Sequence, residues 1–150
     1  GVLPEDTHVA IDCVGAIPYY SGLKVLDRLG LTDREVAREG TATERLMAHD
    51  RRASPELARR RGVDLWAADF VHLLWSPSDP GFARLVSQAH QERASVWAAA
   101  TEDGRFLLVS PLQGIGVTRR RFPRLEFLPV SDATVARRLL QEAAGGATPH

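Results

Sequence analysis

The sequence predicts a single α/β domain, spanning residues 1–150, with a mixed β-sheet that contains an antiparallel hairpin and is flanked by helices. Apolar runs of strand length alternate with segments that carry helical spacing and capping residues. An Asp-Gly pair separates the apolar runs 96–101 and 105–110, which is a strong hairpin signal. With 150 residues, of which 44% are hydrophobic and 25% are charged, the chain can bury one hydrophobic core.

The segments 8–14 and 22–30 are the first two candidate elements of the chain. The first is an apolar run that predicts a buried strand. The second has apolar spacings that fit a strand and a helix equally, so its structure is left open. In 31–39, Thr32 or Asp33 is a suitable N-cap, and a short helix is expected there.

A further short helix is predicted by three residues that mark its ends. Ser54 is a suitable N-cap, Pro55 suits the first helical position, and Gly62 follows the last one. The apolar residues of 63–75 then predict a buried strand and a second buried element close behind it.

The second half of the chain continues with a loop at 76–81. In this loop, Asp79 and Pro80 predict the N-cap and the first residue of a helix. After the hairpin, residues 111–116 predict a loop, and 125–130 predict a short strand.

The chain is predicted to end in a helix and a tail. Ser131 or Asp132 is a suitable N-cap, and apolar residues follow at helical spacing. The helix is expected to stop at Gly145, so residues 145–150 form a flexible tail.

The charge balance and the single cysteine restrict the possible functions. With 19 basic and 19 acidic residues, the formal net charge is zero, so the chain as a whole does not attract nucleic acid. Cys13 has no second cysteine with which to form a disulfide or a redox pair. The chain has no apolar stretch long enough to span a bilayer and no signal peptide, so it is expected to be soluble.

Motifs of the common enzyme classes are absent from the sequence. It contains no Gly-x-Gly-x-x-Gly pattern, no Walker loop, no His-Glu-x-x-His and no Gly-x-Ser-x-Gly. The histidines lack the spacing of metal ligands, so no metal and no cofactor are expected. The five histidines are His8, His49, His72, His90 and His150.

The segment 15–33 is the strongest candidate for a binding site. It directly follows an apolar strand, and open α/β sheets bind ligands just beyond their strand ends. Its tyrosines offer flat apolar faces, while its serine and aspartates accept hydrogen bonds, a combination that suits a polyol or a sugar. The alternative is a turn fixed by proline, with one tyrosine in the core and aspartates that cap helices. The candidate residues are Tyr19, Tyr20, Ser21, Asp27 and Asp33.

Part of this segment also carries a resemblance to a known family. The pattern Gly15-Ala-Ile-Pro-Tyr-Tyr-Ser-Gly, followed by Leu29-Gly-Leu-Thr-Asp-Arg, resembles the start of the soluble domain after the membrane spans of some actinobacterial glycosyltransferases. These integral-membrane enzymes of the GT-C class use polyprenyl-phosphate sugars as donors. His49 corresponds to a Gly-His feature of that family, with Ala48 in place of the glycine. The likeness covers about the first half of the chain.

The resemblance implies an accessory domain on the extracytoplasmic face of the cell membrane, which acts in cell-envelope glycan or glycoconjugate assembly. Its implied partners are the membrane-spanning part of the same polypeptide and a carbohydrate or polyprenyl-phosphate-sugar substrate. It adds Arg34 and His49 to the candidate substrate-binding residues. It places no catalytic residue in this chain, because the general base of that class lies between membrane spans. The fragment alone is therefore expected to be inactive.

Two other functions are compatible with the sequence. A free-standing soluble domain would bind a small molecule or a protein through 15–33 or through the basic cluster 119–124. A helix-turn-helix regulator is suggested by residues 31–52. The neutral net charge argues against DNA binding, because phosphate recognition needs an excess of basic residues.

Overall fold

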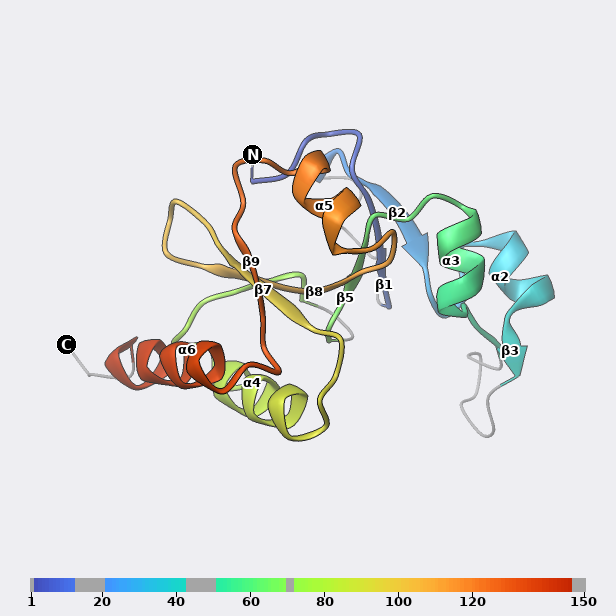
Figure 1. The fold of residues 1–150 in the computed structure, drawn as a ribbon. Helices are drawn as coiled ribbons and strands as arrows, with labels where there is room; N and C mark the ends of the chain where they lie inside the picture. The colour runs from blue at the N-terminus through green and yellow to red at the C-terminus, as the bar shows by residue number, and fades with distance from the viewer. Residues whose placement is uncertain (1, 13–20, 43–50, 70–71, 147–150) are drawn as a thin grey trace.

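A computed structural model, which describes residues 2–12, 21–42, 51–69 and 72–146, confirms the predicted α/β fold with a mixed sheet (Figure 1). The main sheet has seven strands: β1 (His8–Ile11), β2 (Lys24–Asp27), β5 (Leu65–Ala67), β6 (Leu74–Trp75), β7 (Trp97–Ala100), β8 (Phe106–Pro111) and β9 (Phe127–Pro129). A second sheet pairs β3 (Thr41–Ala42) with β4 (Arg51–Arg52). The helices in the described residues are α2 (Arg34–Glu39), α3 (Pro55–Arg60), α4 (Phe82–Gln91), α5 (Ile115–Arg121) and α6 (Ala133–Gly146).

The main sheet consists of a parallel half and an antiparallel half. Its strand order is β2-β1-β5-β8-β7-β9, and β6 also pairs with β8. Strand β1 is parallel to both β2 and β5. From β5 onward every pairing is antiparallel. The carboxyl ends of β1, β2 and β5 therefore lie at one edge of the sheet.

One face of the sheet is covered by two separate groups of helices. Helices α2 and α3 pack their Val36 and Leu57 with Ala10 and Leu26 of the parallel half. Helices α4 and α6 cover the antiparallel half, where Leu108 is fully buried. Figure 1 shows the two groups well apart, with the middle strands between them.

The middle of that face is marked by Trp66 and Ser110. Trp66 pairs with Ala10 on one side and with Ser110 on the other. Paired residues of neighbouring strands point to the same face. Trp66 and Ser110 therefore lie on the face that the helices cover, between the two groups of helices. The opposite face packs against α5, around Phe122 and Phe127.

Three local predictions that depended on turn and cap residues are confirmed. Strands β7 and β8 form the expected hairpin, and Gly104 has a φ of +79°, which favours glycine. The Ser54 hydroxyl caps α3 by accepting a hydrogen bond from the backbone N–H of Leu57. Asp132 caps α6 by accepting from the N–H groups of Thr134 and Val135.

Three expectations need correction or completion. Residues 115–121 form helix α5, although part of this segment was predicted as a loop. The burial of Thr118 and Phe122 stabilises the helix despite the glycine at position 116, which has a low helix propensity. Helix α4 begins at Phe82, because the Asp79 carboxylate accepts from the backbone of Ser76 and does not cap it. The open segment 22–30 contains strand β2.

The helix-turn-helix interpretation does not fit the segment that follows α2. Strand β3 begins two residues after the helix and pairs with β4. A strand therefore occupies the position of the expected turn.

Candidate functional site

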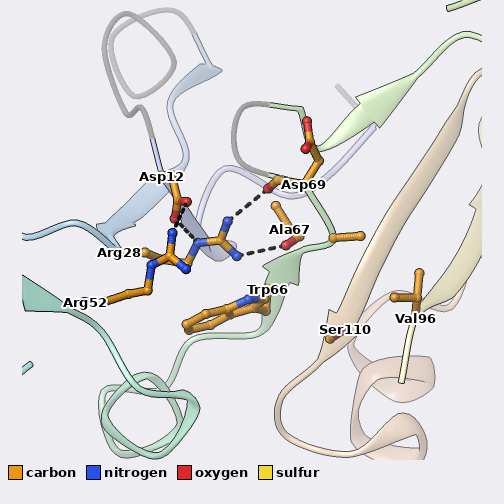
Figure 2. A pocket seen from close by; sticks show the side chains of 9 residues that line it. Asp12, Arg28, Arg52, Trp66, Ala67, Asp69, Val96 and Ser110 are labelled. Carbon is orange, nitrogen blue, oxygen red and sulfur yellow. Dashed lines mark hydrogen bonds and ion pairs between the residues drawn. The ribbon is translucent and has the colours of Figure 1, made fainter. Parts of the chain in front are cut away.

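A cleft of about 240 Å³ lies at the carboxyl ends of the three parallel strands, in the gap between the two groups of helices. It is shown in Figure 2. Asp12 directly follows β1, Arg28 follows β2, and Asp69 lies two residues after β5. The lining residues are Asp12, Arg28, Arg52, Trp66, Ala67, Ala68, Asp69, Val96 and Ser110.

The inner wall of the cleft is built around a buried ion pair. Asp12 is 2% exposed and Arg28 is 5% exposed. The Arg28 Nε donates to Asp12 Oδ1 at 2.5 Å. Its two terminal nitrogens donate to the backbone carbonyls of Ala67 and Asp69, each at 2.9 Å (Figure 2). One guanidinium therefore fixes the ends of all three parallel strands.

The charges of this pair depend on each other. Burial lowers the pKa of the Arg28 guanidinium from its ordinary value, and the neighbouring Asp12 carboxylate opposes that effect. An arginine nevertheless keeps its charge at neutral pH. Removal of either partner would leave an uncompensated charge in the protein interior, which is strongly destabilising.

The groups that face the cleft are chemically varied. The Arg52 side chain is 41% exposed, and its Nη2 lies 3.4 Å from Asp12 Oδ2. The Arg28 guanidinium lies over the Trp66 ring, with its Cζ atom 4.7 Å from the ring centroid. The Asp69 carboxylate is 28% exposed and lies 3.4 Å from His72 Nδ1. With the hydroxyl of Ser110, the cleft therefore offers a cation, an anion, a hydroxyl and an aromatic ring.

A second cleft of about 650 Å³ adjoins the first one. It lies along α4 and shares Ala68, Asp69 and Val96 with the first cleft. The two clefts therefore meet at the end of β5.

The structure describes four of the seven residues that the sequence predicted for the site, and none of these four lines either cleft. Tyr19, Tyr20 and His49 lie outside the described residues. Arg34 is exposed on α2, and the Ser21 hydroxyl accepts from the N–H of Leu23.

The two predicted aspartates have local structural contacts. The buried Asp27 carboxylate accepts from the backbone of Leu29 and from the backbone and hydroxyl of Thr32, which holds the turn after β2. Asp33 caps α2 and pairs with Arg61 at 2.6 Å. The alternative interpretation, in which aspartates cap helices, therefore describes Asp33.

The residues that build the first cleft were not among the sequence candidates. A signal for three of them was present, because Asp12, Arg28 and Asp69 are charged residues that interrupt the segments 8–14, 22–30 and 63–75. Arg52 and Ser110 carried no such signal, since they reach the cleft only through long-range packing.

The described residues give two further findings. They contain no helix that is long and apolar enough to cross a membrane. They also contain no group of three or more histidine, cysteine, aspartate or glutamate side chains placed to hold a metal ion.

The fold and the cleft define an α/β domain with a polar cleft at the carboxyl edge of its parallel strands. Residues 2–109 match the model of the DUF8728 family, a domain of unknown function, and the chain belongs to this family. The match ends within β8, so it includes every lining residue of the first cleft except Ser110. No curated protein and no solved structure matches the chain.

Proposed function

We propose that this domain binds a small polyhydroxylated ligand, such as a sugar, in the first cleft. The observation that carries the proposal is the convergence of Trp66, Ser110, Arg52 and Asp69 on one cleft. Hydroxyl groups both donate and accept hydrogen bonds, and these side chains supply partners of both kinds. The partly buried indole of Trp66, over which the Arg28 guanidinium lies, adds apolar surface for the C–H groups of a sugar.

The balance of charge supports an uncharged ligand in this cleft. Its two carboxylates, Asp12 and Asp69, are matched by two guanidinium groups, Arg28 and Arg52. The volume of about 240 Å³ is below the usual range for drug-sized ligands, and it suits a single ring. The buried ion pair preorganises the cleft, because it fixes the strand ends before the ligand arrives.

The test is calorimetric titration of the protein with methyl glycosides of glucose, galactose and mannose. Asp69→Asn should weaken binding of the preferred sugar by about tenfold or more, because a charged hydrogen-bond acceptor is replaced by a neutral amide. The backbone carbonyl that accepts from Arg28 is retained in this variant.

Glu102→Gln is the matched control, since it neutralises an exposed carboxylate in the turn between β7 and β8. The control should bind like the wild-type protein. Failure of all three sugars to bind, or unchanged affinity of Asp69→Asn, would contradict the proposal.

The role within a larger protein stays a prediction from the resemblance alone. In that role the domain would bind or orient the sugar acceptor of a membrane glycosyltransferase on the extracytoplasmic face, or brace its membrane part. Replacing Tyr20 and His49 by alanine in the parent enzyme should then lower acceptor affinity or turnover. Unchanged kinetics would remove these two residues from the proposed site.

A further inference from the structure

From the two adjoining clefts we infer that the ligand of this site is a glycoside with an uncharged apolar substituent, which lies in the second cleft. The inference rests on the proposed function, because it assumes that the sugar ring occupies the first cleft. It adds the class of group to which that sugar is attached.

The first step of the argument is the connection between the clefts. Ala68, Asp69 and Val96 line both of them, so the two spaces adjoin at these residues. The second cleft, at about 650 Å³, is the larger one. A ligand that fills only the first cleft would leave this adjoining space to water.

The second step is the apolar lining along α4. Leu85, Ala89 and Ala94 line the second cleft, and all three belong to or pack against the core beneath α4 and α6. Trp75, which is 5% exposed, also lines the second cleft. The His72 ring packs edge-on against Trp75, with the two ring centroids 4.9 Å apart. These side chains favour a group that gains free energy by leaving water.

The third step is the charge of the lining. Asp69, Asp79 and Glu92 contribute three carboxylates, whereas Arg84 contributes one guanidinium. Even with His72 protonated, the carboxylates outnumber the cations. A phosphate or a carboxylate linked to the sugar would be repelled there, so the substituent carries no negative charge.

The experiment compares three derivatives of the same sugars by calorimetric titration of the full chain. The probes are the methyl glycosides, the phenyl glycosides and the 1-phosphates of glucose, galactose and mannose. For the preferred sugar, the phenyl glycoside should bind at least about tenfold more tightly than the methyl glycoside, because its ring is buried on binding. The 1-phosphate should bind more weakly than the methyl glycoside.

A pair of variants assigns the effect to the second cleft. Gln88 is exposed on α4 and lines this cleft, so Gln88→Trp should fill it and remove the preference for phenyl while the methyl glycoside still binds. Gln91→Trp is the matched control, because Gln91 is exposed on the same helix and lines neither cleft. The control should keep the preference.

The outcomes separate the inference from the function on which it rests. Equal binding of methyl and phenyl glycosides, tighter binding of the 1-phosphate, or a preference that persists in Gln88→Trp would overturn the inference and leave sugar binding in place. Absence of binding by every derivative would overturn both.

Discussion

The parallel and antiparallel halves of the sheet use their buried positions differently. In the parallel half, Asp12, Asp27 and Arg28 are charged residues buried at the ends of strands. In the antiparallel half, the buried polar residues among those described are two threonines, Thr101 and Thr118. The antiparallel half is thus stabilised mainly by apolar packing. The parallel half instead places buried charges next to the cleft. Their desolvation lowers the stability of the fold, so stability alone does not account for this arrangement.

The substitution with the largest expected effect acts on the parallel half. Arg28→Met should lower the free energy of unfolding by about 3 to 5 kcal/mol, because Asp12 keeps a buried charge without its main partner. Urea denaturation measures this loss, and sugar binding should disappear with it. The double variant Asp12→Leu, Arg28→Met should recover much of the stability but none of the binding.

If Arg28→Met lowered the free energy of unfolding by less than about 1 kcal/mol, Asp12 would not be effectively buried. The parallel half would then not differ from the antiparallel half in holding buried charges. If the variant does not fold, Arg28→Lys provides a second measurement. It keeps the charge but has no planar fork to reach Asp12 and the two carbonyls together. It should therefore lie between the wild-type protein and the methionine variant in stability.

A somewhat smaller effect is expected from truncation in the antiparallel half. Leu108 is fully buried, so Leu108→Ala should lower the free energy of unfolding by about 2 to 5 kcal/mol through lost burial and a cavity. Sugar affinity at a temperature where the variant is folded should be unchanged, because Leu108 does not line the first cleft. If the folded variant also bound sugar more weakly, packing in the antiparallel half would be shown to affect the first cleft.

The smallest effect concerns pH and His8 on β1. Burial lowers the pKa of His8 below its ordinary value, as does the charge of Arg61, while Asp64 opposes them. The unfolded chain therefore binds a proton more readily, so this contribution to stability is complete above about pH 6.5 and is lost as the pH falls below it. Urea midpoints between pH 7.5 and 5.5 should fall less steeply in His8→Gln than in the wild-type protein.

Leu108→Ala is the control for the pH series, because it removes no titrating group. Its midpoint should be lower at every pH, with the wild-type dependence on pH. A wild-type slope in His8→Gln would show that other groups account for the pH dependence.

The elements predicted correctly from the sequence are those with local signals. The turn at Gly104, the cap at Ser54 and the cap at Asp132 each involve residues within a few positions of one another. Helix α5 was missed because its stability comes from the burial of Thr118 and from Phe122, which packs with residues of distant strands. Local propensity does not contain this contribution.

The candidate site was only partly accessible to sequence reasoning. The expectation that polar residues gather beyond the strand ends agrees with the first cleft, where Asp12, Arg28 and Asp69 meet. The particular residues proposed were different, because Asp27 and Asp33 have local backbone partners that a linear pattern does not distinguish from ligand-binding roles. Trp66 could not be placed, since a tryptophan in an apolar run is equally typical of a core residue.

The contacts of Arg28 also have a consequence for the order in which the chain folds. This side chain joins residues 12, 28 and 67–69, and Ser110 completes the cleft from still farther along the sequence. The hairpin of β7 and β8, by contrast, closes over a few residues. Because distant contacts require more chain entropy to be lost first, we expect the hairpin to form early and the cleft to form late. Binding-competent molecules would then appear only at the end of refolding.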